Sequence, residues 1–455
     1  MKLSHVPSAV SASFDEPNLV GTAGLEPAMR LAERCRLGEL ADELVRIPGP
    51  AGAFTGAKVT SIVAGMLAGA DSIDDLDVVR HGALDRLFTE VRAPSTLGTH
   101  LRSYTWGHVR QLQKVSRMFL TQLARCAPLL PGKDILVFID VDSKVKRVYG
   151  GTKQGAAFGY TGEWGLHPQV VTISTPLAVP VIGVSRMRGG NANSGRGAAS
   201  LLTEGFGVAR QAGCTGQMVA RGDSSFYSGS VTTACRKAGA WFMITAKLDP
   251  AVVDAILAIP EKSWVNIKYP QAIWDEQEQL WISEAQIAEV VYTAFAGTRH
   301  EVTARLIVRR VKRLTPPPKD HPAKLPTQWR YHPCFTDAPF PLVQAEEFHR
   351  DHAIVEQVNA DLNNSAAAHL PSKVFTANAA WYTLAALVHN LTRAVGALAS
   401  MFHAKASTGT IRRHLIQVPA RIASSAGKLK LHLSDNWPWE YAWEQLFAAT
   451  HPVPT

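Results

Sequence analysis

The stretch KDILVFIDVD, residues 133–142, decides the fold of this chain. Its β-branched and aromatic run from Ile135 to Ile139 is typical of a buried β-strand. The strand closes on Asp140 and Asp142, whose carboxylates are expected on one face because side chains alternate along a strand. Strands disfavour aspartate, so a pair of acids here indicates a functional site more strongly than a turn or a helix cap.

More strands are expected after this one. QVVTIST (169–175) and VPVIGVSRM (179–187) follow directly, and a Gly/Asn-rich loop then leads into a helix. GQMVARGDSSFYS (216–228) holds a strand that stops at an acid, SVTTACRKAG (230–239) suits a helix, and WFMITAK (241–247) suits a further strand. Three adjacent strands followed by alternating helix and strand predict one central mixed sheet covered by helices.

Two further carboxylates extend the acid pair. Asp223 ends the strand in 216–228 and precedes two serines, so it is either a site residue or the N-cap of the next helix. Glu356 lies in HRDHAIVEQVNADLN (349–363), inside a helix expected over about 344–363. Acids gathered at one sheet edge repel one another unless a cation neutralises them, and oxygen ligands without thiolates select Mg²⁺ or Mn²⁺. Two such ions activate a nucleophilic oxygen and stabilise the leaving oxygen of a phosphodiester.

The region from Glu26 to Cys126 is expected to be helical, because its apolar residues recur three and four apart. One of its helices carries a row of cationic and histidine side chains: Arg102, His108, Arg110, Lys114 and Arg117. A basic helix after a short helix and a turn is what a DNA-binding domain needs, and a plain helical bundle with a solvated basic face explains the pattern equally well.

Changes in composition and in the pattern of apolar residues divide the chain into six parts. They are an expected loose arm (1–25), a helical domain predicted to bind DNA (26–128), the first part of a predicted catalytic domain (131–248), a mainly β insertion (249–340), helices of the predicted catalytic domain that carry Glu356 (341–405) and a C-terminal segment (406–455). Within the fifth part, the long apolar helix expected over 378–402 is assigned to core packing. The fold class is therefore α/β, with an N-terminal helical domain and a catalytic sheet interrupted by a β-rich insertion.

The composition is that of an ordinary globular protein, with 46% hydrophobic and 19% charged residues. A net charge of +9 favours a polyanionic partner, of which nucleic acid is the usual one. Five scattered cysteines form no CxxC pair, which argues against a disulfide framework or a cysteine zinc site. Neither a membrane span nor a signal peptide is expected, and the predicted location is the cytoplasm, in association with the nucleoid.

Seven stretches together resemble the DDE transposases of bacterial insertion sequences, and among them most closely the thirteen-eighty family. They are GADSIDDLDVVRHGALDRLF (69–88), APSTLGTHLR (93–102), FIDVDSKVKRVYGGTKQGAAFGYTGEWGLHPQ (138–169), VARGDSSFYS (219–228), AEEFHRDHAIVEQVNADL (345–362), HLPSKVFTANAAW (369–381) and TIRRHLIQVPARI (410–422). Each motif alone is modest, but their order and spacing across most of the chain are specific. The resemblance implies a ribonuclease-H-like catalytic core interrupted by a β-rich insertion.

The resemblance also implies a catalytic triad that holds two Mg²⁺ or Mn²⁺ ions. The first aspartate maps to Asp142, which is followed by a hydroxyl residue as in the family pattern, with Asp140 as the alternate; the others map to Asp223 and Glu356. The family's Tyr, Arg, Glu, Lys signature reads His349, His352, Glu356 and Asn363 here, with its spacing intact. The family analogy makes His349, His352 and Asn363 contacts to the cleaved DNA strand, and Arg102, Arg110 and Lys114 are the basic residues expected on DNA.

The implied activity is cut-and-paste transposition, in which strands are cut at the element ends and the free 3′-OH ends are joined to a target. The implied partners are the terminal inverted repeats, the target DNA and a second copy of the chain in a homodimer. A catalytically inactive relic that only binds element ends is the alternative, motivated by the altered signature. A zinc hydrolase using His349 and His352 is a third and weaker interpretation, because the HExxH motif is absent.

Overall fold

The computed structural model describes residues 10–267, 274–275, 280–281, 285–313 and 322–451. Its centre is a nine-stranded mixed sheet with the order β10-β13-β14-β15-β9-β8-β2-β6-β7. The five strands expected from the sequence form one end of it: β2 (Val137–Ser143), β6 (Gln169–Ser174), β7 (Val181–Arg186), β8 (Met218–Gly222) and β9 (Trp241–Thr245). The expected α/β class with a central mixed sheet is confirmed.

Strand direction follows from the connections. The successive strands β2, β6 and β7 pair antiparallel, whereas β8 and β9 run parallel to β2. Parallel neighbours need crossover connections, and two helices supply them: α6 (Ala198–Gln211) leads from β7 to β8, and α7 (Gly229–Lys237) leads from β8 to β9. As a result, β2, β8 and β9 all end at the same edge of the sheet.

The β-rich segment continues this sheet rather than standing apart from it. After α8 (Pro250–Leu257) come β10 (Val265–Ile267), β11 (Trp274–Asp275), β12 (Leu280–Trp281), β13 (Ala285–Ala294), β14 (Val302–Lys312) and β15 (Trp329–Thr336). β13 and β14 pair over ten residues each, and β15 pairs antiparallel with β9. Four of these strands, β10, β13, β14 and β15, thus belong to the central sheet, whereas β11 and β12 pair with each other in a separate two-stranded sheet.

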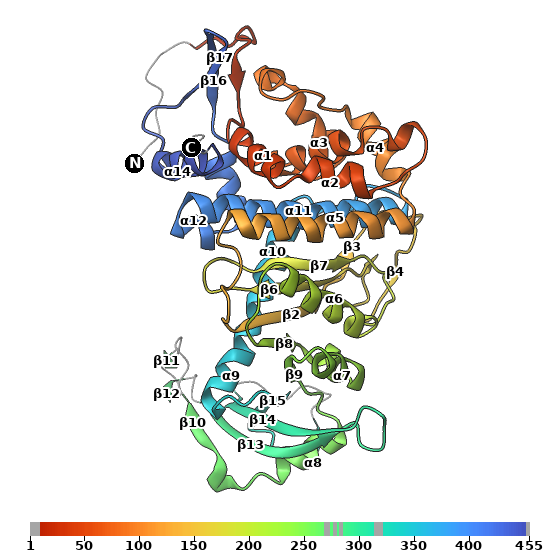
Figure 1. Cartoon of the computed structure of the whole chain (residues 1–455). Coiled ribbons are helices and arrows are strands. Elements are labelled where there is room, and N and C mark those ends of the chain that lie inside the picture. Colours follow the sequence, from red (N-terminus) through yellow and green to blue (C-terminus); the bar gives the residue numbers. More distant parts are fainter. Residues whose placement is uncertain (1–9, 268–273, 276–279, 282–284, 314–321, 452–455) are drawn as a thin grey trace.

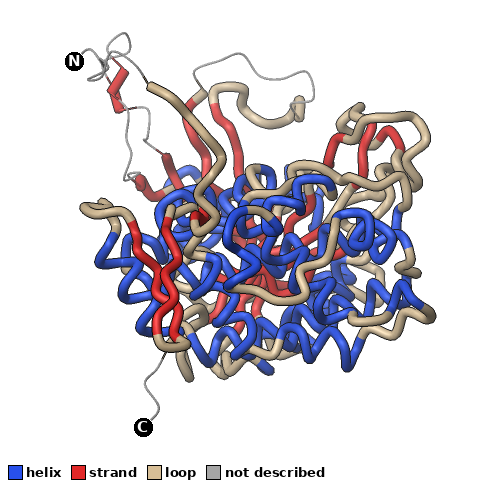
Figure 2. The backbone as a smooth tube through the Cα atoms, turned by 90° about the horizontal axis from the view of Figure 1, so that it is seen from above, coloured by secondary structure: helices blue, strands red, loops and turns tan. Residues whose placement is uncertain are grey.

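Helices cover the other end of the sheet. The apolar helix α11 (Phe375–Ala399), expected as a core helix, is buried along most of its length, and it packs on α5 (Trp106–Cys126) and β7. Figure 1 shows α5 and α11 side by side between the sheet and the N-terminal helices α1 (Leu25–Arg34), α2 (Leu37–Leu44), α3 (Thr55–Ala68) and α4 (Pro94–Arg102). Seen from above, helices lie over the strands in the middle of the molecule (Figure 2).

The two ends of the chain meet in a second, small sheet. Strand β1 (Leu19–Val20) pairs antiparallel with β16 (Ala420–Ser425), which pairs in turn with β17 (Lys428–Leu433). The expectation of a loose arm over residues 1–25 is therefore wrong for Leu19 and Val20, because backbone hydrogen bonds to a distant strand order them; residues 1–9 lie outside the described part. Near this sheet, α14 (Glu440–Thr450) packs against α1 and α11.

The helix expected over 344–363 is broken. The structure has α9 (Leu342–Arg350), a 3₁₀ turn at Asp351–Ala353 and then α10 (Ile354–Asn363). The Arg221 side chain donates to the carbonyl of Phe348 at 2.6 Å, in the last turn of α9. A side chain that takes up a helix carbonyl is a recognised cause of a kink, and a helical periodicity in sequence does not reveal it. No helix among the described residues is long and apolar enough to cross a membrane.

Candidate active site

Two aspartates lie side by side at the ends of two neighbouring strands. β2 and β8 are parallel, with Val141 opposite Gly222, so the next residue on each chain is an aspartate: Asp142 on β2 and Asp223 after β8. Asp142 is half-buried and Asp223 is exposed. Asp223 also accepts a 2.8 Å hydrogen bond from the Ser225 N–H, so the helix-capping role considered as its alternative is present as well.

The surroundings of Asp142 raise its pKa. Burial is the main cause, and repulsion from the carboxylate of Asp223 acts in the same direction. The Ser143 N–H at 2.7 Å and the Asn359 side chain donate hydrogen bonds to Asp142 and oppose the increase. A half-buried acid beside a second acid is the environment in which a bound cation lowers the electrostatic free energy most.

Helix α10 lies along the end of β2 and presents a row of polar side chains to it. Its Asn359 bonds Asp142, its Asn363 bonds Lys146, and His352, in the turn before it, bonds Asp140. Glu356 follows His352 by four residues and precedes Asn359 by three, so it shares their face of the helix. Glu356 is exposed, and it lies in the sequence between two residues that contact β2, His352 and Asn359.

Asp140, the alternate first aspartate, has very different surroundings. It is fully buried, and the Arg221 guanidinium donates to both of its oxygens at 2.6 and 2.9 Å. Ser174 donates to it at 2.7 Å, and His352 Nδ1 lies 3.1 Å from Oδ1. Burial alone would raise the pKa of Asp140, but Arg221 and His352 hold it well below its usual range. Asp140 is thus a permanently charged, fully bonded anchor.

Sequence reasoning missed Arg221 and Asn359, which organise this region. Arg221 is buried under the ring of Phe138, with its guanidinium carbon 4.1 Å from the ring centroid. An arginine inside the apolar strand of 216–228 was the available signal, because a buried cation requires an anion nearby. Asn359 carried a weaker signal, its position three residues after Glu356 on a helix.

The two histidines of the altered signature face different partners. His349 Nε2 lies 3.0 Å from the Thr245 hydroxyl at the end of β9, and burial lowers the pKa of His349 to about 3, with further lowering by nearby cationic side chains. His349 is consequently neutral at physiological pH. Among the described residues, no three His, Cys, Asp or Glu side chains stand close enough to hold a metal ion, so neither a zinc site nor a closed carboxylate triad is preassembled.

The donor chemistry nevertheless fits a hard divalent cation. Asp142 and Asp223 supply two neighbouring carboxylates, and the facing helix supplies the exposed Glu356. All three donors are oxygens, which suit Mg²⁺ and Mn²⁺. Arg221 already forms an ion pair with Asp140, so its charge does not neutralise Asp142 and Asp223.

Comparison with known protein families identifies the chain. Residues 8–454 match the family described as Transposase DDE domain group 1. The chain belongs to the DDE transposases. A comparison with curated proteins gave no match. Membership supports a transposase function of the polynucleotidyl-transferase type with DNA as the partner, and it confirms the resemblance at the level of the family; the thirteen-eighty branch remains a prediction.

The basic residues expected on DNA occupy two kinds of surroundings in this transposase. Arg102 and Lys114 are exposed. Arg110 instead pairs with Glu204 of α6 at 3.0 Å, in a cluster that Arg117 and Arg186 complete at 3.2 and 2.6 Å. Arg110 therefore joins α5 to α6, whereas the other two side chains are available at the surface.

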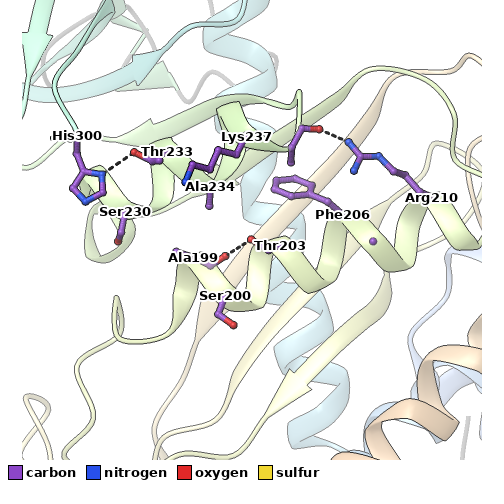
Figure 3. Close-up of a pocket in the computed structure, with 12 residues that line it drawn as sticks. Ala199, Ser200, Thr203, Phe206, Arg210, Ser230, Thr233, Ala234, Lys237 and His300 are labelled. Carbon is purple, nitrogen blue, oxygen red and sulfur yellow. Dashed lines mark hydrogen bonds between the residues drawn. The ribbon is translucent and has the colours of Figure 1, made fainter.

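A groove of about 500 Å³ separates α6 from α7 in the transposase (Figure 3). Serine and threonine side chains line its walls, with Arg210, Lys237 and His300 around them. His300 Nδ1 lies 2.8 Å from the Thr233 hydroxyl, and Arg210 bonds the Ala238 carbonyl. None of the described lining residues is acidic, so the groove is not a metal site of the carboxylate type.

Proposed function

We propose that this transposase cuts DNA at the ends of its own element and joins the freed 3′-OH ends to target DNA, using Asp142, Asp223 and Glu356. The observation that carries the proposal is the register of β2 and β8, which brings Asp142 beside Asp223, together with the placement of Glu356 on the facing α10. Family membership supports the activity and the substrate class.

The topology supports a ribonuclease-H-like catalytic core. The strand order β7-β6-β2-β8-β9, with β6 antiparallel to both neighbours and the last two strands parallel to β2, is the pattern that such a core requires. In an open α/β sheet, ligands bind beyond the carboxyl ends of the parallel strands. Asp142 and Asp223 stand at those ends.

The choice of Asp142 over Asp140 rests on their bonding. Both carboxylate oxygens of Asp140 already accept hydrogen bonds from Arg221. Breaking that ion pair would leave a buried cation unpaired. Asp142 is half-buried and faces another acid, with Asn359 and the Ser143 N–H fixing its orientation. Asp142 is therefore the better metal ligand, and Asp140 positions the helix that carries Glu356.

When bound, two Mg²⁺ or Mn²⁺ ions supply a polarised nucleophilic oxygen and charge stabilisation at the phosphodiester. Asp142, Asp223 and Glu356 would hold these ions, and Asn359 would keep the Asp142 carboxylate in place. His352 uses Nδ1 for Asp140, which leaves Nε2 for a phosphate of the cleaved strand. Contacts of His349 and Asn363 with that strand, the thirteen-eighty branch and a homodimer that synapses two ends are further parts of the proposal.

A strand-transfer assay tests the function directly. Purified full-length protein is incubated with a labelled duplex that ends in the terminal inverted repeat with a free 3′-OH, a supercoiled plasmid target and Mg²⁺ or Mn²⁺. The expected product is the labelled strand joined covalently to the plasmid, absent with EDTA. Tight binding of the duplex with no joined or cut product in any metal would favour the inactive relic.

A further inference from the structure

A small sheet follows directly after Asp142. It consists of β3 (Lys146–Arg147), β4 (Ala157–Phe158) and β5 (Trp164–Leu166), in the order β3-β5-β4. Figure 1 shows β3 and β4 at one side of the central sheet. A Cβ at Gly165 would lie 2.4 Å from the Lys146 carbonyl oxygen, so the close pairing of β3 with β5 depends on this glycine.

Several aromatic side chains on this sheet and its turns are exposed to solvent. Tyr149 is 72% exposed, Phe158 66% and Tyr160 74%. Phe158 lies against the half-buried Trp164, with ring centroids 5.2 Å apart, and Tyr160 lies 5.8 Å from the ring of His167. Several large exposed rings within a dozen residues are unusual in a surface without a partner, and such a cluster marks an interaction site.

Cationic side chains lie in the same segment as these rings. Residues 144–163 contain three lysines and one arginine against a single acid, Glu163. Lys144 and Arg147 are exposed, and the Arg147 guanidinium carbon lies 5.5 Å from the centroid of Tyr149. Exposed rings with exposed cations in the same segment suit a strand of nucleic acid, because bases stack on the rings while the cations meet the phosphates.

The small sheet that carries the rings is linked to the candidate active site through buried residues. On β5 the side chains of Trp164 and Leu166 share one face, and the register places Phe158 opposite Trp164 and Lys146 opposite Leu166. Lys146 in turn bonds Asn363 of α10, the helix that carries Glu356. One face of the small sheet thus runs from exposed rings to the helix beside the carboxylates.

We propose that Phe158, Trp164 and Tyr160 form a stacking platform for unpaired bases of the DNA strand whose backbone enters the active site. A duplex at a cutting site has to open for its bases to reach such rings, and the platform stabilises the opened strand. The position of the platform relative to the cut rests on the proposed function. Binding of a single strand to it does not, and it is measurable without cleavage.

The test uses full-length protein in EDTA, where no cleavage occurs, and fluorescence anisotropy with two labelled probes. One probe is a deoxythymidine strand of about 16 nucleotides, and the other is an abasic deoxyribose-phosphate strand of the same length. The variants are Phe158→Leu and Tyr160→Leu, which keep apolar volume without an aromatic face. The matched control is Tyr441→Leu, which removes a ring of similar exposure, 71%, from α14.

Each platform variant is expected to bind the thymidine strand about 5- to 100-fold more weakly, the size of one lost base-stacking contact. Binding of the abasic strand should change by no more than about twofold, because phosphate contacts remain. Unchanged binding of the thymidine strand, equal losses on both probes, or an equal loss in Tyr441→Leu would overturn the proposal. A platform variant whose mass in sedimentation changes while its strand binding does not would also overturn the proposal, because the rings would then form a contact between copies of the chain. Failure of strand transfer alone, with these binding results intact, would instead count against the proposed function.

Discussion

Replacing Asp140 with asparagine should destabilise the transposase by about 3 kcal/mol, although the change removes no volume. The Asp140 carboxylate is 0% exposed, and the Arg221 side chain that donates to it is 2% exposed. Breaking a buried pair leaves one uncompensated charge, which costs roughly 3–5 kcal/mol. Arg221 keeps its bond to the Phe348 carbonyl and its place over the Phe138 ring, so we expect the lower part of that range.

Asp142→Asn is the matched control, and the expected sign is opposite. Burial and Asp223 raise the pKa of Asp142, so its charged form opposes folding at neutral pH, and asparagine removes that charge. The variant should be as stable as the wild type or slightly more stable. Asp140 contributes stability above the unfolded-state pKa of an aspartate, and this contribution is lost only as the pH falls through its lowered folded-state pKa.

The assay is urea unfolding followed by circular dichroism at pH 7, with Arg221→Met/Asp140→Asn as a third variant. Removing both charges should recover much of the loss, since no buried ion then remains unpaired. An Asp140→Asn variant as stable as the wild type, or an Asp142→Asn variant several kcal/mol less stable, would refute the assignment of Asp140 as anchor and Asp142 as ligand.

Three other outcomes are expected. Alanine at any of the three proposed ligands should abolish strand cleavage; the variants are Asp142→Ala, Asp223→Ala and Glu356→Ala. Their binding of element-end DNA in a gel-shift assay should be nearly unchanged, because phosphate contacts dominate affinity. His352→Ala should cut about 10- to 100-fold more slowly in single-turnover assays, and His352→Arg should retain activity; a fully active His352→Ala would contradict the phosphate contact. Binding of element-end DNA should weaken steeply as the salt concentration rises. Lys114→Ala should reduce the slope of log K against log salt by about 1 for each lost phosphate contact. Arg110→Ala should leave that slope unchanged, because Glu204 already pairs with Arg110.

Periodicity and residue type were sufficient to predict the strands that carry the site. The β-branched run before Asp140 became β2, and the strand that stops at Asp223 became β8. β8 runs parallel to β2 because the helix α6 connects it by a crossover to β7, which has the same direction as β2, and this parallel pairing brings Asp142 and Asp223 to one edge. These features depend on local sequence and on the handedness and length of connections, which a single sequence contains.

The features that escaped prediction all depend on contacts between distant residues. Asp140 bonds Arg221, which is 81 positions away, and the break after α9 follows from the bond between Arg221 and Phe348, 127 positions apart. The pairing of β15 with β9 likewise made the β-rich segment part of the central sheet. A helical or alternating pattern records which face is buried, but it does not record which residue lies against that face.

Cleavage of element-end DNA by the wild type and by Asp223→Ala tests the central claim most directly. Asp223 is exposed, so its removal should spare the fold, and its carboxylate accepts a short-range capping hydrogen bond from the Ser225 N–H. The duplex is labelled on each strand in turn, incubated with Mg²⁺ or Mn²⁺, and the cuts are mapped at nucleotide resolution. We predict a cut at the element end with a 3′-OH terminus for the wild type, and none for Asp223→Ala despite equal binding. Cleavage by Asp223→Ala at the wild-type rate, or wild-type cleavage that persists in EDTA, would contradict a metal-dependent site built on Asp142, Asp223 and Glu356.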